Sequence, residues 1–328
     1  MKKFLFYIFG FTFVIILLFS LITFITDKGL KKSEYGNLKE WSDIFNKNIH
    51  ADIVIQGSSR AWVQFNTYIL DSVLNADAYN MGMDGTPFDV QYVKYKSYTE
   101  NNKYPEVILQ NVDWDTMDKN TPVFQKYQLL PYLNNHYFDE QLLNNKIIPD
   151  KDVYLSFLKY AGEPKAVQVG FSEYVGIRHY VSPKHKGFMS VEGNWNESDF
   201  EKRKNGGKIH WEKNPEVEKL FIEFLQDCQS KKIKVVLVFA PYYHGLNNII
   251  IDMTGLKTYY RNIAIKYNVE FLDYSLDPVF HDKNYFYNAS HLNKKGAEMF
   301  TLKLANKLKD MQIIKPANTN QPEKLKAK

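Results

Sequence analysis

The chain has 328 residues, of which 45% are hydrophobic and 16% aromatic, so it is long and apolar enough to bury a large core. Its net charge of +5 is modest and spread along the sequence, which argues against nucleic acid as a partner. A single cysteine, Cys228, excludes an internal disulfide bond, and eight scattered histidines give no metal-binding pattern, so we expect neither a metal nor another cofactor.

The first predicted element is a helix that crosses a membrane. Residues 4–25 form an almost unbroken apolar run, and at about 1.5 Å per residue such a helix spans the roughly 30 Å hydrocarbon layer of a bilayer. The run is longer than the apolar part of a cleaved signal peptide and ends without small residues suited to cleavage. We therefore predict an uncleaved signal anchor over residues 1–27 and a linker over residues 28–50.

Lysines flank this apolar run on both sides. The numbers of positive residues on the two sides are nearly equal, so the rule that positive charges stay inside the cell only weakly indicates the orientation of the helix. We expect the short N-terminal tail to lie inside the cell and the main domain outside it. The predicted location is therefore the cell membrane, with a single pass and an extracytoplasmic domain.

Beyond the anchor, apolar strands alternate with helices over residues 51–313. Strands that are apolar throughout and separated by helices are typical of a parallel sheet covered on both faces. We predict an α/β, doubly wound, flavodoxin-like fold. The expected strands are 51–57, 76–82, 105–114, 233–241 and 269–274, and the expected helices are 59–75, 87–102, 215–232, 256–268 and 294–311.

Two stretches lie outside this alternation. Residues 118–212 are rich in tyrosine, asparagine, lysine and proline, and we interpret them as an insertion between sheet strands that covers the cleft. Residues 314–328 lack apolar periodicity and are predicted to form a disordered tail.

The loops at the carboxyl ends of parallel strands converge and usually carry the chemistry of such a fold. The first predicted strand is followed by Gly57, Ser58, Ser59 and Arg60, and the last helix is preceded by His291. A serine hydroxyl is a poor nucleophile near neutral pH unless a neighbouring imidazole accepts its proton. His291 is therefore the candidate base for a serine of this turn.

The same edge offers donors for a developing negative charge. A tetrahedral intermediate needs N–H groups aimed at its oxyanion. Gly85 follows the second strand in "NMGMDG", and Asn111 ends the third strand, so both lie on suitable loops. Ser58 and Arg60, in the turn after the first strand, are also candidates to bind the substrate or the oxyanion. A helix that begins after Gly57 would add its dipole.

Together these motifs resemble the four blocks of the SGNH (GDSL-like) hydrolases: a serine after the first strand, a glycine after the second, an asparagine after the third and a histidine before the last helix. The Gly-Asp-Ser of that family corresponds to "GSS" here, which implies that Ser59 is the nucleophile, and "NASHLNKKGA" resembles the last block. "GSSR" with "SHLNKKGA" resembles the membrane-anchored branch, whose members transfer or remove acyl groups on cell-surface polymers. The resemblance covers about residues 51–310 without the insertion.

The chain departs from the family pattern at two positions. Asn288 stands three residues before His291, where the family has the aspartate that orients the imidazole, and in a Ser-His-Asp site the change to asparagine costs about 10⁴ in rate. Three outcomes follow: a working Ser-His pair, another acid such as Asp282 or Asp113 in its place, or a fold retained for binding. The third block is echoed only loosely by "LQNVD", which weakens the assignment of Asn111.

Each signal also has a structural interpretation. "GSS" can be a turn with a serine N-cap, His291 can be a capping or surface residue, and the glycines of "NMGMDG" can serve a tight turn. Arg60 can bind an anionic substrate group, or it can neutralise Asp84 or Asp113. The tryptophans at 62, 114, 195 and 211 can form a sugar-stacking surface or belong to the core and its rim.

The sequence thus favours a membrane-anchored SGNH-type serine esterase or O-acyltransferase. Its expected partners are the membrane, through the N-terminal helix, and an acylated glycan or other surface polymer as substrate. The alternative is an SGNH-fold protein that binds a glycan or an assembly partner with little catalysis, and Asn288 is the residue that favours it.

Overall fold

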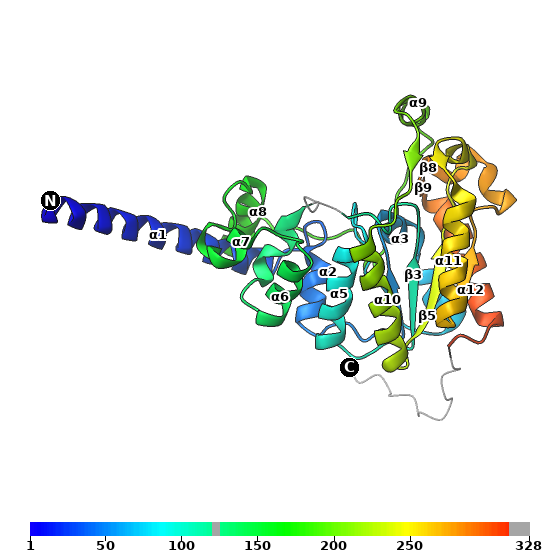
Figure 1. Ribbon diagram of the computed structural model, residues 1–328, viewed down its shortest axis with the longest axis horizontal. Coiled ribbons are helices and arrows are strands. Elements are labelled where there is room, and N and C mark those ends of the chain that lie inside the picture. The colour runs from blue at the N-terminus through cyan, green and yellow to red at the C-terminus, as the bar shows by residue number, and fades with distance from the viewer. Residues whose placement is uncertain (120–124, 315–328) are drawn as a thin grey trace.

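The computed structural model describes residues 1–119 and 125–314. The tail predicted over 314–328 lies outside the described residues except for its first residue. Helix α1 (Lys2–Leu30) projects from one end of a body that is built around a central sheet (Figure 1).

The central sheet has five parallel strands in the order β2-β1-β3-β5-β7. This order places the first strand next to the second and third, as in a flavodoxin-like sheet. The predicted parallel α/β fold is therefore confirmed. The strands are β1 (Ile53–Gln56), β2 (Ala78–Asn80), β3 (Val107–Asn111), β5 (Lys234–Phe239) and β7 (Glu270–Asp273).

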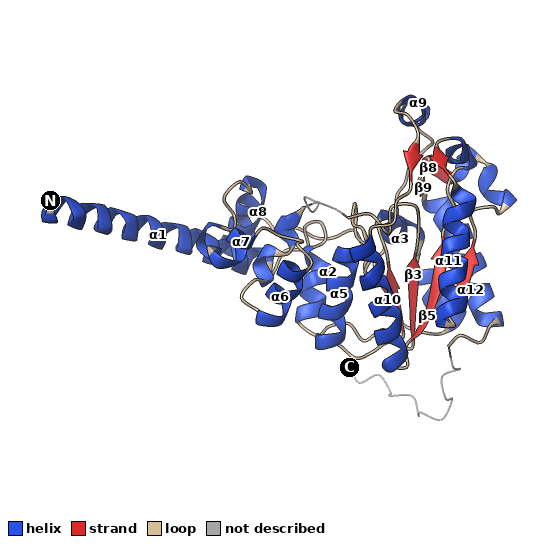
Figure 2. Ribbon diagram, in the orientation of Figure 1, coloured by secondary structure: helices blue, strands red, loops and turns tan. Residues whose placement is uncertain are grey.

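Both faces of the sheet are covered because side chains of each strand alternate between two apolar cores. Val54 and Ile108 belong to one core, whereas Ile53 and Ile55 belong to the other. The first core is covered by α2 (Leu38–Phe45), α5 (Phe88–Asn101), α10 (Pro215–Ser230) and α11 (Met253–Tyr267). The second core is covered by α3 (Ser59–Gln64), α4 (Thr67–Leu74) and α12 (Lys294–Asp310). Figure 2 shows the helices and the strands in separate colours.

The single helix predicted over 59–75 is wrong, because the chain forms two helices there. It breaks at Phe65, and Asn66 starts α4 as its N-cap, with the Asn66 side chain accepting a hydrogen bond from the N–H of Tyr68 at 3.0 Å. The Asn66 N–H in turn donates to the Thr301 Oγ1 of α12 at 3.0 Å. The break lets α3 and α4 point in different directions while both cover the sheet.

The stretch predicted as a linker over 28–50 contains an ordered helix instead. Leu38, Trp41 and Ile44 lie one turn apart on α2, and all three are fully buried. The Trp41 indole N–H also donates to the Gln128 Oε1 at 3.0 Å. This amphipathic helix is therefore part of the domain.

The insertion predicted over 118–212 divides into two parts, a first part up to residue 177 and a second part after it. Its first part lies beside α1 and α2, and its second part returns across the sheet edge, where the Met189 N–H donates to the Trp62 carbonyl at 3.1 Å. Of the described insertion residues, the second part therefore reaches α3 at the carboxyl edge of the sheet, and its role in covering a cleft stays a prediction. The described elements are η1 (Lys126–Gln128), η2 (Leu130–Tyr132), α6 (His136–Asn144), α7 (Asp150–Tyr154), η3 (Ser156–Leu158), α8 (Pro164–Val175), α9 (Glu197–Asn205) and β4 (Ile209–His210).

Short elements complete the carboxyl edge of the sheet. β4 pairs in parallel with β6, and β8 pairs with β9 in an antiparallel hairpin. These elements are η4 (His244–Asn248), β6 (Ile250–Ile251), η5 (Pro278–His281), η6 (Lys283–Tyr285), β8 (Phe286–Asn288) and β9 (His291–Leu292).

Helix α1 is long and apolar enough to cross a bilayer, and its apolar part is not buried in the protein. Its C-terminal end packs closely against α8. A Cβ on Gly29 would lie 1.7 Å from the Gly170 carbonyl oxygen, and a Cβ on Gly170 would lie 2.7 Å from the Thr26 carbonyl oxygen. Only glycine at both positions permits this approach.

We expect Gly29→Val to lower the thermal stability of the full-length protein in detergent. The new side chain would overlap the backbone of α8, and overpacking of this kind costs about 1–3 kcal/mol or more. Gly10→Val is the matched control on the same helix, because a Cβ there meets nothing within 4 Å. Equal melting temperatures for the two variants would contradict the close packing of α1 and α8.

Candidate active site

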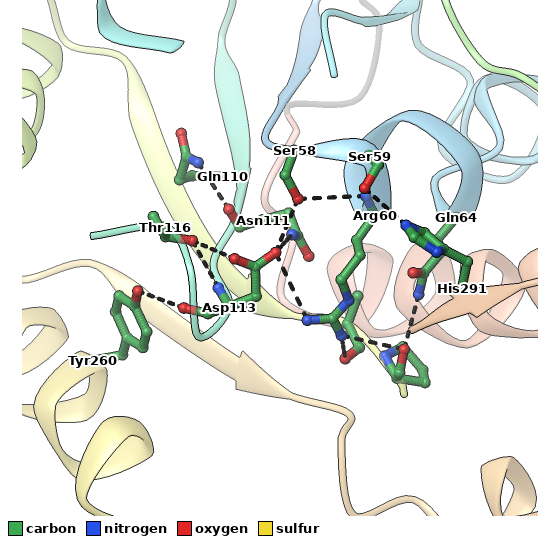
Figure 3. Close-up of polar contacts among 12 residues, drawn as sticks. Ser58, Ser59, Arg60, Gln64, Gln110, Asn111, Asp113, Thr116, Tyr260 and His291 are labelled. Carbon is green, nitrogen blue, oxygen red and sulfur yellow. Dashed lines mark hydrogen bonds and ion pairs between the residues drawn. The ribbon is translucent and has the colours of Figure 1, made fainter. Parts of the chain in front are cut away.

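Ser59 and His291 meet at the carboxyl edge of the sheet. Ser59 begins α3 just after β1, and His291 begins β9. The Ser59 Oγ lies 2.8 Å from the His291 Nε2 (Figure 3). Both residues are half-buried, so the pair keeps access to solvent. The structure therefore brings together the serine and the histidine that the sequence analysis paired.

The hydrogen bonds of Asn288 determine which nitrogen of His291 carries the proton. The Asn288 Oδ1 accepts hydrogen bonds from the backbone N–H groups of Ser290 and His291, each at 3.0 Å, so this atom must be the amide oxygen. The same oxygen lies 3.0 Å from the His291 Nδ1, which therefore carries the hydrogen and donates it. The Nε2 is left with a lone pair directed at Ser59, as a proton acceptor requires.

The β8–β9 hairpin holds the His291 ring from the other side. Tyr287 stacks on the ring with centroids 5.5 Å apart and planes 9° apart. The backbone of the hairpin is fixed by two hydrogen bonds, from the Asn196 N–H to the Tyr287 carbonyl at 3.2 Å and from the Tyr243 N–H to the Ala289 carbonyl at 2.9 Å. Sequence reasoning missed Tyr287, because the β8–β9 hairpin that places it against the ring was not predicted.

The turn before Ser59 is tight because two other residues approach Gly57. A Cβ at Gly57 would lie 2.7 Å from the Ala61 Cβ and 2.8 Å from the Asn111 Cβ, so a larger residue would displace α3 or β3. Ser58 is the N-cap of α3, and its Oγ accepts from the Arg60 N–H at 3.4 Å. The N-cap interpretation of "GSS" thus applies to its first serine, which leaves the second free to face the histidine.

Beneath this turn lies the buried carboxylate of Asp113. Its Oδ2 accepts hydrogen bonds from the Ser58 Oγ at 3.0 Å and the Asn111 Nδ2 at 3.1 Å, and its Oδ1 accepts one from the Thr116 Oγ1 at 2.7 Å (Figure 3). Burial alone would raise the pKa of Asp113, but hydrogen bonds from its neighbours and the charge of Arg60 lower it. Asp113 therefore stays charged and is directed at Ser58.

Of the three outcomes left open for the missing aspartate, replacement by Asp113 or Asp282 is not what the contacts of these residues show. Asp113 is engaged beneath Ser58, and Asp282 caps η6 by accepting from the Asn284 N–H at 2.9 Å. The partner of the His291 Nδ1 is Asn288 itself.

The Arg60 side chain is buried and contacts other groups of the protein rather than solvent. Its side chain is only 3% exposed, and its Nη1 lies 3.8 Å from the Asp113 Oδ2. Its Nη2 donates to the carbonyl oxygens of Ala240 and Pro241, and the guanidinium lies 4.8 Å from the centre of the Trp114 ring. Of the two roles considered for Arg60, this geometry supports neutralisation of Asp113.

The two predicted oxyanion donors lie in different settings. Asn111 is fully buried, and its amide nitrogen donates to Asp113, so it supports the floor of the site. Gly85 is itself exposed, in the otherwise largely buried loop after β2, with φ of 60°, a conformation that glycine adopts readily and that a tight turn requires. Their participation in an oxyanion hole stays a prediction.

Asn80 is a further residue that sequence reasoning missed. Its side-chain nitrogen donates to the carbonyls of Ala61 at 2.8 Å and Phe65 at 3.0 Å, and its oxygen accepts from the Gly82 N–H at 2.8 Å. It therefore ties the loop after β2 to the end of α3. An asparagine at the end of a predicted buried strand was the available signal.

The electrostatic setting keeps His291 neutral. Burial, together with the positive charges of Arg60 and Arg203, lowers the pKa of His291 to about 3. A neutral imidazole can accept the Ser59 proton over the whole physiological pH range. The charge of Asp113 favours the protonated ring, but the group that the His291 Nδ1 contacts is the neutral Asn288 amide and not a carboxylate.

A groove of about 780 Å³ lies apart from this site, between α4 and the start of α12. Tyr68, His185 and Met299 are among its lining residues, and in the described part of the chain neither Ser59 nor His291 lines it. We therefore place the candidate chemistry at Ser59.

The chain matches no protein-family model and no curated protein. Among solved structures, it is similar to a protein from Desulfitobacterium hafniense named as a lipolytic protein of the G-D-S-L family, with 10% identity over 77% of this chain and 97% of that one, and a TM-score of 0.39. A protein from Streptococcus pneumonia named as a platelet activating factor shares 13% identity over 86% and 93% of the two chains, with a TM-score of 0.43. A protein from Bacteroides fragilis named as an acylhydrolase shares 12% identity over 78% and 86%, with a TM-score of 0.35. We base the fold on the strand order and register of this chain rather than on these similarities.

We expect Asn288→Asp to change the pH dependence of any reaction at Ser59. The base must be neutral, so the low pKa of His291 should keep activity constant well below pH 6.5 in the unchanged protein. A carboxylate at 288 would raise that pKa by about 1–3 units and move the acidic limb toward neutral pH. It would also stabilise the imidazolium and increase the rate above that limb.

The measurement is the rate of Ser59 labelling by a fluorophosphonate as a function of pH. Asp282→Asn serves as the control, because that carboxylate caps η6 and makes no contact with the ring. An acidic limb near pH 6.5 in the unchanged protein would contradict the account of His291.

Proposed function

We propose that this protein is a membrane-anchored serine esterase or O-acyltransferase of SGNH type, acting on acyl groups of cell-surface or capsular glycans. The observation that carries the proposal is the continuous hydrogen-bonded series of Ser59 Oγ, His291 Nε2, His291 Nδ1 and Asn288 Oδ1. Nucleophile, base and orienting group are each within hydrogen-bonding reach of the next, as covalent catalysis requires.

The mechanism follows from this geometry. The Ser59 Oγ attacks the ester carbonyl carbon as its proton passes to the His291 Nε2, and a tetrahedral intermediate forms. The imidazolium then gives the proton to the leaving alcohol, and the acyl group stays on Ser59. Water or a sugar hydroxyl, deprotonated by the same Nε2, attacks the acyl-enzyme. The imidazolium then returns that proton to the departing Ser59 Oγ, which releases the free acid or a new ester and restores the enzyme.

Asn288 performs one of the two tasks of the usual aspartate. In a Ser-His-Asp protease, much of the loss of about 10⁴ on changing aspartate to asparagine comes from the wrong histidine tautomer. Here two backbone N–H groups hold the amide oxygen toward the ring, so the productive tautomer is kept. Only the charge is missing, which is why we favour an active enzyme.

Two features support the membrane and glycan parts of the proposal. α1 is long and apolar enough to anchor the chain in a bilayer. Beside the hairpin, the half-buried rings of Trp195 and Tyr243 lie 4.6 Å apart between centroids, and Lys283 lies 5.0 Å from the Trp195 ring. Aromatic faces of this kind suit the apolar faces of sugar rings.

A second candidate function is binding of a glycan or an assembly partner without turnover. The observation in its favour is the absence of a carboxylate from the neighbours of the His291 Nδ1 among the described residues, where the neutral Asn288 stands. In that case the carboxyl edge of the sheet would recognise the ligand, and binding would not require the Ser59 hydroxyl.

We expect a fluorophosphonate to label the full-length protein in detergent at Ser59. Ser59→Ala should abolish labelling, because the reacting oxygen is removed. Ser58→Ala should retain it, because the Ser58 hydroxyl donates to Asp113 and not to His291. Melting temperatures of both variants control for folding.

Absence of labelling in a folded, unchanged protein would contradict the enzyme proposal. Unaltered glycan binding by Ser59→Ala together with that result would favour the binding function. Labelling that persists in Ser59→Ala and disappears in Ser58→Ala would show that the reacting residue is Ser58 and not Ser59.

A further inference from the structure

The first part of the insertion packs around the end of α1. The Thr23 Oγ1 donates to the Phe157 carbonyl at 3.0 Å, and the Lys159 ammonium lies 2.9 Å from the Asp27 carboxylate. The Tyr160 hydroxyl donates to the same carboxylate at 2.5 Å. With the contact between Gly29 and α8 described above, these bonds fix the insertion to the last two turns of the helix.

These contacts set the height of the insertion relative to a bilayer. The apolar run of α1 ends at Ile25, so the hydrocarbon boundary lies near the last apolar turn. Thr23 is within this turn, and its partner Phe157 is therefore at the boundary. Leu155 is two residues from Phe157 and so within about 7 Å of it along the chain.

Large apolar side chains are also exposed on α8, which packs against the C-terminal end of α1. On α8, Phe171, Tyr174 and Val175 are spaced three and four residues apart, so they lie on one face, and each is more than 40% exposed. The opposite face of the helix is buried, including Val169 and Gly170, the latter against Thr26 of α1. We call the exposed residues the apolar collar; its members are Tyr154, Leu155, Phe171, Tyr174, Val175 and Ile177.

An exposed apolar surface of this extent usually marks a contact that the isolated chain does not show. The collar is continuous with α1, which has its own apolar surface exposed. Lys28, Lys31 and Lys32 are exposed near it. Tyrosines beside an apolar surface, with lysines nearby, are the composition of a membrane interface that contains anionic lipids.

We propose that the apolar collar inserts into the interface of the same bilayer that α1 crosses, so that the domain is attached to the lipid at two places. A single helix allows a domain to rotate and tilt, whereas a second contact off the helix axis restricts both motions. The proposal rests on α1 as a membrane span and not on the chemistry of Ser59.

The test uses the full-length protein in nanodiscs of phosphatidylcholine and phosphatidylglycerol, with one copy in each disc. Phe171→Cys and Ile177→Cys carry an environment-sensitive fluorophore, and the native Cys228 does not compete because it is fully buried. Lys219→Cys on α10 is the exposed control, since its native side chain is 78% exposed. Val14→Cys reports insertion of α1.

We expect labels at 171 and 177 to be quenched by spin-labelled lipids and to be several-fold less accessible to iodide than the label at 219. Equal iodide access at 171, 177 and 219 would overturn the proposal. So would iodide access at 14, because α1 would then not be inserted. Protection at 171 and 177 only in discs with two copies would also overturn it, because the collar would then be an interface between two chains.

Discussion

The hydrogen bond between the Ser59 Oγ and the His291 Nε2 joins residues that are 232 positions apart, and the proposed function depends on it. Each partner is positioned by its own device. Gly57 allows α3 to start close to Asn111, which places Ser59 at the sheet edge, and the β8–β9 hairpin holds the ring between Tyr287 and Asn288. Because a displacement of about 1 Å can cost roughly 10²-fold in rate, both devices are needed together.

The site separates two tasks that an aspartate normally combines, orientation of the imidazole and stabilisation of its charged form. Asn288 provides orientation through an amide oxygen that backbone N–H groups hold in place, but it provides no charge. The buried negative charge of Asp113 favours the protonated ring, but its oxygens are engaged by Ser58 and Arg60. A histidine in this setting stays unprotonated at acidic pH, but its charged form is stabilised less by the surrounding residues than beside an aspartate.

The strand order and the meeting of Ser59 with His291 could be predicted because they follow from local patterns: apolar runs of strand length, helical periodicity between them and polar residues where strands end. The break at Asn66 could not, because it depends on Thr301 of a distant helix. The helix at 38–45 was hidden because its apolar face meets residues far along the chain, such as Gln128. The stacking of Tyr287 and the engagement of Asp113 likewise depend on contacts that no local spacing specifies.

The most direct test of the central claim is ¹⁵N NMR of the histidine side chains in the full-length protein, with His291→Gln used to assign the His291 signals. The account predicts a neutral ring with hydrogen on Nδ1 and a bare Nε2, unchanged from neutral pH down to about pH 5, well below the ordinary histidine pKa of about 6.5. Hydrogen on Nε2 at neutral pH, or titration of His291 near pH 6.5, would contradict it.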